Sequence, residues 1–237
     1  MKDGNWQCCE AEKAIDRLVG CVRAGDLDAL RALVGSGFDL NGCDQRGETI
    51  FERVIGELEF CPGKQRCAVI REMLRLGADP GVVGSDGSTP LFTAVVNMDT
   101  RMIGILLDAG ADPNASLRIL RGAGSEADTV GSRAVAESLY DWAKFAYRYE
   151  VWETRLPEDV PIADQADEDA WLGEVDRLAV EYGKRRPDHL RLLRERGALS
   201  TLELCRAAQA LDDDDDPHPA GHAVRALWPS GRASPKR

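Results

Sequence analysis

Histidine, lysine and long apolar runs are scarce in this chain of 237 residues. Only three histidines occur, and lysine supplies six of the thirty basic residues. No apolar run approaches the roughly 20 residues that a membrane-spanning helix needs. The first twenty residues carry early acids and lack the apolar core of a secretory signal. We therefore expect a cytoplasmic protein with no membrane partner.

Cysteines at the spacing of a zinc site or a disulfide framework are also missing. The seven cysteines lie at positions 8, 9, 21, 43, 61, 67 and 205, an odd number without a C-x-x-C pair. A disulfide framework or a zinc site would show pairs at closer, regular spacing. The pattern predicts reduced cysteines that pack as small apolar side chains, and no metal site.

The residues that common kinds of catalysis require are scarce too. A nucleophile needs a positioned base beside it, but His218 and His222 lie in a tail rich in proline and aspartate, and His189 is expected on an outer helix. The loosely glycine-rich segment 121–132 has no Lys-Ser or Lys-Thr ending to hold phosphates. We expect no catalytic residues, no cofactor and no enzymatic activity.

Acidic residues, in contrast, are abundant. Forty-one Asp and Glu against thirty Lys and Arg give a formal net charge of −11. This charge argues against binding to nucleic acid or to anionic membranes, both of which need a basic surface. It is compatible with a basic protein partner. With 43% apolar residues, the chain can fold around a sizeable core.

Three segments of the chain repeat one pattern. Residues 29–41 read ALRALVGSGFDLN, residues 69–80 read VIREMLRLGADP, and residues 102–114 read MIGILLDAGADPN. Each predicts an amphipathic helix that ends at a glycine, where the backbone takes a positive φ. Gly77 and Gly110 are 33 residues apart, whereas Gly37 and Gly77 are 40 apart. The segment 60–66, FCPGKQR, accounts for the seven extra residues as a loop.

A second pattern precedes two of these helices. Residues 85–101, SDGSTPLFTAVVNMDTR, combine an Asp-Gly turn with a capping threonine and a proline at the first helical position. Residues 44–59 repeat the pattern with Gly47, Thr49 and Phe51. The helix pair and its period of 33 residues resemble the ankyrin repeat. The family's T-P-L-H-x-A motif stands here as TPLFTA at 89–94, with Phe92 in place of the usual histidine.

The resemblance implies an all-α ankyrin-repeat solenoid of about four repeats. They cover residues 11–42, 43–80, 81–114 and 136–200, and the first lacks the turn, as a terminal capping repeat does. The fourth is split: 137–150 resembles a first helix and 187–200 a closing helix, with a helical acidic insertion at 150–186. Residues 201–211 are predicted to form a terminal helix. Residues 212–237, which begin with five aspartates, are predicted to form a disordered tail.

The acidic insertion leaves two interpretations open. Eleven Asp or Glu lie between residues 150 and 181. A helix at 164–182 would place on one side Trp171, Leu172, Val175, Leu178 and Tyr182. The acids then form either the solvated face of a helix packed over the end of the solenoid, or a negative surface that steers a basic partner.

The segment 139–152 is rich in aromatic residues. One face of its predicted helix, which we expect to be the core stripe, holds Trp142, Phe145, Tyr149 and Trp152. The surface would then hold Tyr140, Lys144, Tyr147 and Arg148. Exposed Tyr and Arg are typical of interface hot spots. The alternative is that the insertion covers these four residues.

The resemblance also implies where a partner binds, because ankyrin domains bind proteins on the concave surface made by their turns and first helices. The corresponding positions here are Arg23, Gln45, Arg46, Glu48, Glu57, Ser85, Asp86, Ser88, Val96 and Asn97. Side chains on such a rigid scaffold form a preorganised binding face.

We therefore interpret the chain as a non-catalytic protein–protein interaction module, monomeric when free. The short array, the acidity and the expected lack of a second domain favour an antitoxin or immunity protein that neutralises a basic protein. A regulatory adaptor or scaffold, including an exported effector, is the alternative. A third hypothesis is an enzyme with its site under the 150–186 insertion, which would need an acid pair such as Asp141 and Glu150.

Overall fold

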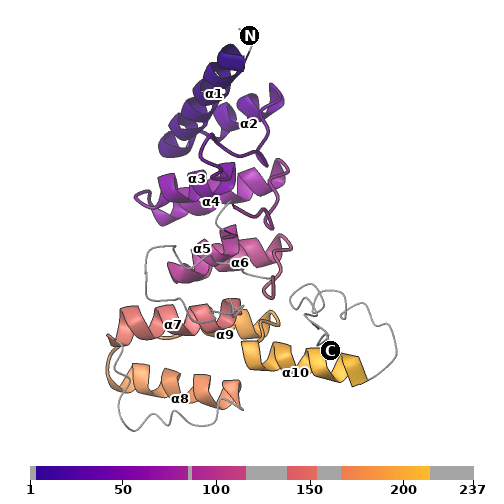
Figure 1. The fold of residues 1–237 in the computed structure, drawn as a ribbon. Helices are drawn as coiled ribbons and strands as arrows, with labels where there is room; N and C mark the ends of the chain where they lie inside the picture. Colours follow the sequence, from indigo (N-terminus) through magenta and orange to yellow (C-terminus); the bar gives the residue numbers. More distant parts are fainter. Residues whose placement is uncertain (1–3, 85–86, 116–137, 154–166, 214–237) are drawn as a thin grey trace, which may run out of the picture.

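The helices of the computed structural model stack in two layers (Figure 1). The structure describes residues 4–84, 87–115, 138–153 and 167–213. One layer consists of α1 (Gly4–Ala24), α3 (Ile50–Leu58), α5 (Pro90–Val96) and α7 (Leu139–Trp152). Each helix of this layer contacts the next. The other holds α2 (Leu27–Gly35), α4 (Gly63–Arg75), α6 (Thr100–Asp108) and α9 (Asp188–Glu195), of which α4 contacts α6 and α6 contacts α9. After α7 and α9 in the chain come, respectively, α8 (Glu168–Glu181) and α10 (Thr201–Asp213).

The rest of the described chain consists of turns and loops. Within these residues there is no strand, and an isolated antiparallel bridge joins Cys43 to Thr49. None of the helices that the structure describes is both long enough and apolar enough to cross a membrane. Residues 116–137 of the predicted loop and split repeat, 154–166 of the insertion and 214–237 of the tail lie outside the described residues.

Three helices of the first layer begin in the same way. In α3, α5 and α7 the N-cap hydroxyl accepts a hydrogen bond from the third backbone amide that follows, and the caps are Thr49, Thr89 and Ser138. This bond satisfies a donor that the first turn of a helix leaves unpaired. Two residues after each cap lies a buried large side chain: Phe51, Leu91 and Tyr140. The three helices therefore present the same face to the core.

Four helices of the second layer end in the same way. The chain leaves each of them through a glycine with positive φ: 99° at Gly37, 99° at Gly77, 96° at Gly110 and 82° at Gly197. The next amide then donates back to a carbonyl of the last turn, for example from Ala111 to Leu106 at 3.0 Å. This closing motif satisfies the end of the helix and directs the chain toward the next pair.

Replacing Gly110 with valine is expected to lower the free energy of unfolding by roughly 1–2 kcal/mol, because a β-branched residue is strained at positive φ. An added Cβ would meet no atom within 4 Å, so the backbone conformation alone carries the penalty. Gly110→Asn is the matched control, since asparagine tolerates the left-handed region better. Urea unfolding measures the difference, and equal midpoints for the two variants would contradict the prediction.

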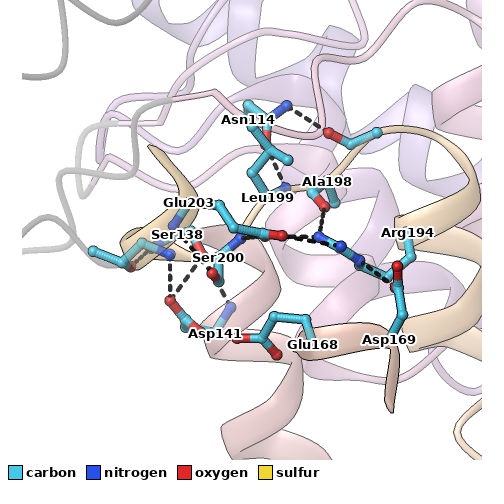
Figure 2. Close-up of polar contacts among 12 residues, drawn as sticks. Asn114, Ser138, Asp141, Glu168, Asp169, Arg194, Ala198, Leu199, Ser200 and Glu203 are labelled. Carbon is cyan, nitrogen blue, oxygen red and sulfur yellow. Dashed lines mark hydrogen bonds and ion pairs between the residues drawn. The ribbon is translucent and has the colours of Figure 1, made fainter. Parts of the chain in front are cut away.

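Two asparagines tie helix ends together across the stack. Asn41 donates through Nδ2 to the Gly77 carbonyl at 3.0 Å, and its Oδ1 accepts from an amide two residues further at 2.7 Å. Asn114 makes the same pair of bonds, at 2.9 Å to the Gly197 carbonyl and 2.9 Å from the Leu199 amide (Figure 2). The chain after α6 therefore contacts the end of α9 as the chain after α2 contacts the end of α4.

Candidate functional site

The predicted partner-binding positions differ in exposure. The exposed ones are Arg23, Gln45, Arg46, Val96, Asn97 and Arg148, and the half-buried ones are Glu48 and Glu57. Ser85 and Asp86 lie outside the described residues. Ser88 is buried, contrary to its predicted place on the binding surface, and its hydroxyl donates to the Glu52 carboxylate. That bond fastens the turn before α5 to α3.

Three of these positions belong to one series of ion pairs on α1, on α3 and in the turn before α3. The Arg23 guanidinium lies 2.6 Å from the Glu57 carboxylate. Arg53 lies 3.4 Å from Glu57 and 3.9 Å from Glu48. Arg53, which the sequence analysis did not select, therefore pairs with two of the predicted partner-binding residues, Glu48 and Glu57. Its position one turn before Glu57 on α3 was the available signal.

The prediction that Tyr140 and Tyr147 lie on the surface is wrong, because both side chains are fully buried. Lys144, expected beside them on the surface, has a side chain that is 17% exposed. Its ammonium group donates to the Glu168 carboxylate of α8 at 2.8 Å. Of the four residues expected to form this surface, Arg148 is the exposed one.

A different set of aromatic residues, here called the aromatic ladder, reaches the surface of α7 instead. It consists of Phe92, Trp142, Phe145 and Tyr149, whose consecutive ring centroids are 5.7, 5.9 and 6.2 Å apart. Such distances suit edge-to-face and stacked aromatic pairs. Phe145 and Tyr149 are 59% and 57% exposed, so the prediction that they face the core is wrong. The ladder runs from α5 to α7 and leaves two large rings in water.

The register of the helices explains which rings of α7 are buried. Counted from the N-cap, Tyr140 and Ala143 occupy the positions that Leu91 and Ala94 occupy in α5, and all four are buried. The inward face of α7 therefore follows 140, 143 and 147, and Phe145 points away from it. The match between SLYDWA at 138–143 and TPLFTA at 89–94 indicated which face of α7 is buried. Grouping the aromatic residues by helical spacing did not.

A polar network joins the start of α7 to the start of α10 (Figure 2). The Asp141 carboxylate accepts from the Thr201 amide at 2.7 Å, and the Ser138 amide donates to the Thr201 hydroxyl at 2.8 Å. Burial raises the pKa of Asp141, but hydrogen bonds from Thr201 and the contact with Lys144 outweigh it and lower the pKa. Asp141 is thereby held ionised as an acceptor that fastens two helices.

The carboxylates between residues 167 and 186, the part of the acidic insertion that contains α8, are paired within the chain. The ion pairs of α8 are Glu168 with Lys144, Asp169 with Arg194, Asp176 with Arg186 and Arg191, and Glu174 and Glu181 with Arg177. Asp167 caps the helix by accepting from the Ala170 amide. Within residues 167–186, every carboxylate therefore has a partner. This pairing favours the interpretation of α8 as a solvated face over the end of the stack.

His189 lies on α9, a helix of the second layer, and its side chain is fully buried. Its ring centroid lies 5.5 Å from that of Tyr147. Burial, and after it the positive charge of Arg185, lower the pKa of His189 to about 4. The ring is therefore neutral near pH 7 and packs as part of the core. Among the residues that the structure describes, no group of His, Cys, Asp or Glu side chains is arranged to hold a metal ion.

Comparison with known proteins identifies one part of this architecture. Residues 86–116 match the family model of the ankyrin repeat, which confirms the resemblance at α5, α6 and the turn that holds Asn114. No curated protein sequence matches the chain. Ankyrin-repeat domains are typically non-catalytic modules that bind other proteins. The chain therefore contains an ankyrin repeat at 86–116, set within a stack of helix pairs.

Proposed function

We propose that this protein is a non-catalytic binding module that receives its protein partner over α3, α5 and α7. The aromatic ladder carries the proposal. Phe145 and Tyr149 expose apolar rings to water, and a partner that covers such rings gains free energy from their burial. Phe92 and Trp142, which are half-buried, hold the two outer rings in place, so the surface is ordered before a partner arrives.

The turn before α3 adds a preference for a basic partner. Burial raises the pKa of Glu48, and the Asp44 and Glu52 carboxylates raise it further against the opposing effect of Arg53. A Lys or Arg side chain of the partner beside Glu48 would stabilise its charged form. The formal net charge of −11 also speeds association with a basic protein.

The array on which this face lies is part of the same proposal. We infer four repeats, the last of them formed by α7 and α9 and interrupted by the insertion that contains α8. Two observations support this count. Ser138 caps α7 as Thr89 caps α5, and Asn114 bonds to the end of α9 as Asn41 bonds to the end of α4.

Within this class of function we favour a neutraliser: an immunity protein or antitoxin that covers one basic protein. A regulatory adaptor or scaffold would instead bind several partners. Once a partner has been identified, expressing it without this chain separates the two roles. A neutralised toxin is expected to arrest growth alone and to become harmless when this chain is made with it, whereas the partners of an adaptor do neither.

Site-specific photo-crosslinking tests the proposed face. A photoreactive phenylalanine analogue at position 145 is expected to capture one partner in the native cells. The same analogue at Phe60, which is 91% exposed and outside the ladder, is the matched control. Equal capture from both positions, or capture from position 60 alone, would place the partner elsewhere.

With the partner identified, removing the two exposed rings is expected to weaken binding strongly. Phe145→Ala combined with Tyr149→Ala should raise the Kd by about 100-fold, since each ring can act as a hot spot. The melting temperature should stay near that of the wild type because both rings are exposed. Phe60→Ala should leave the Kd unchanged. A double variant that binds as tightly as the wild type would contradict the proposal.

The two carboxylates that the enzyme hypothesis requires lie too far apart on α7 to act as an acid pair. Asp141 and Glu150 are nine residues apart on α7, which separates them by roughly 13 Å along the helix axis. Asp141 is held ionised by its partners, whereas a general acid needs a raised pKa. The two carboxylates therefore do not form the pair that the hypothesis required.

A further inference from the structure

A cavity of about 530 Å³ lies where α5 turns into α6. Its apolar lining includes Ile55, Ala94, Met98 and Met102, and its charged lining consists of Arg66, Arg101, Arg185, Glu59 and Asp99. The volume falls within the range of small-molecule sites. No residue of the aromatic ladder lines it, but Ile55 of α3 and Ala94 of α5 do, so the cavity adjoins the proposed partner face.

The three arginines reach the cavity from α4, from α6 and from the segment between α8 and α9. Arg66 lies 3.3 Å from Asp99, whose other carboxylate oxygen caps α6. Arg185 donates to the Met98 carbonyl at 2.6 Å. Arg101 is exposed, and its side chain makes no hydrogen bond or ion pair within the described part of the chain. Three guanidinium groups against two carboxylates make the cavity positive in a chain whose net charge is negative.

Arg185 is fixed at both its backbone and its side chain. Its carbonyl accepts a hydrogen bond from the hydroxyl of buried Tyr147 on α7, while its guanidinium is bound to Met98. The segment predicted as an insertion therefore supplies a wall to a cavity whose other lining residues lie between positions 55 and 102. A guanidinium held in this way is preorganised for a ligand.

Met98 supplies an independent observation at the same place. Its φ is 52°, which is uncommon for any residue but glycine. Gly25 holds the corresponding position, directly before the aspartate that caps α2, with a φ of 67°. Strained backbone of this kind clusters at ligand sites. Here the buried Met98 side chain provides an apolar wall of the cavity that glycine would remove.

We propose that the cavity binds a small organic anion. A phosphate or carboxylate group of the ligand would lie against Arg101 and Arg66, and its apolar body against Ile55 and Met98. The planar guanidinium group matches both kinds of anion with two parallel hydrogen bonds. Arg101 is available for this contact without losing an ion pair, because it has none among the described residues.

Isothermal titration calorimetry of the full chain with phenyl phosphate, benzoate and inorganic phosphate tests the proposal. Phenyl phosphate or benzoate is expected to bind at one site, and the tighter of the two identifies the anionic group. Inorganic phosphate should bind more weakly than phenyl phosphate because it has no apolar body. Arg101→Gln is expected to raise the Kd by about tenfold or more. Arg71→Gln, at an exposed arginine outside the lining, is the matched control and should bind as the wild type does.

Three outcomes would overturn the proposal. The first is a wild-type protein that binds none of the three probes at about 10 mM. The second is equal affinity of the wild type and Arg101→Gln at equal melting temperatures, since the guanidinium would then take no part. The third is inorganic phosphate that binds as tightly as phenyl phosphate, since the apolar wall would then contribute nothing.

Discussion

Replacing Tyr147 with alanine is expected to lower the free energy of unfolding by about 4 kcal/mol, as the loss of a large buried ring does. The side chain is fully buried in α7. Its ring packs against His189 of α9, and its hydroxyl donates to the Arg185 carbonyl. Alanine removes both contacts and leaves a cavity between α7 and α9. Urea unfolding followed by circular dichroism measures the loss.

Two further variants show which property of Tyr147 is responsible. Tyr147→Phe keeps the ring and removes the hydrogen bond, so it should cost about 1 kcal/mol. Tyr149→Ala removes a ring two residues along the same helix, but that ring is 57% exposed and the change should cost about 0.5 kcal/mol or less. If Tyr149→Ala destabilises the protein as much as Tyr147→Ala does, the described inward face of α7 is wrong.

The free energy of unfolding is expected to fall by about 3 kcal/mol between about pH 6.5 and pH 4 because of His189. Burial, with the charge of Arg185 as a second cause, lowers the pKa of this ring to about 4 in the folded protein. In the unfolded chain the pKa is ordinary, about 6.5. The unfolded state therefore binds the proton first as the pH falls. The contribution of the neutral ring is complete above about pH 6.5 and is lost as the pH approaches 4.

The variant His189→Leu isolates this effect, because leucine fills the site and does not titrate. Urea unfolding of both proteins at several pH values should show a smaller acid loss in the variant, by about 3 kcal/mol. Glu72 and Asp176, each with its pKa lowered to about 2 by hydrogen bonds from arginines, also stabilise the folded state. Their contributions fade as the pH falls below about 4.5, and equally in both proteins. Parallel stability curves for the two proteins would contradict the role of His189.

Local signals in the sequence predict much of the architecture. Thr89 and Gly110 mark the start of α5 and the end of α6, because a capping hydroxyl and a left-handed glycine act within one turn of chain. The family match at 86–116 covers the same segment. The candidate binding face was predicted less well. Arg23 and Val96 are exposed as expected, while Tyr140 and Ser88 are buried.

The sequence by itself determined the helix pairs and the residues at which the helices begin and end. Capping and helix formation depend on contacts between residues three or four apart in the chain. Only the tertiary structure decided which aromatic rings face water. That outcome depends on how α7 packs against α5 and α9, so helical spacing within 139–152 allowed two opposite faces. The arginine cavity was beyond sequence reasoning for the same reason. Its lining residues come from separate parts of the chain between Ile55 and Arg185, and no local sequence pattern predicts that they lie close together.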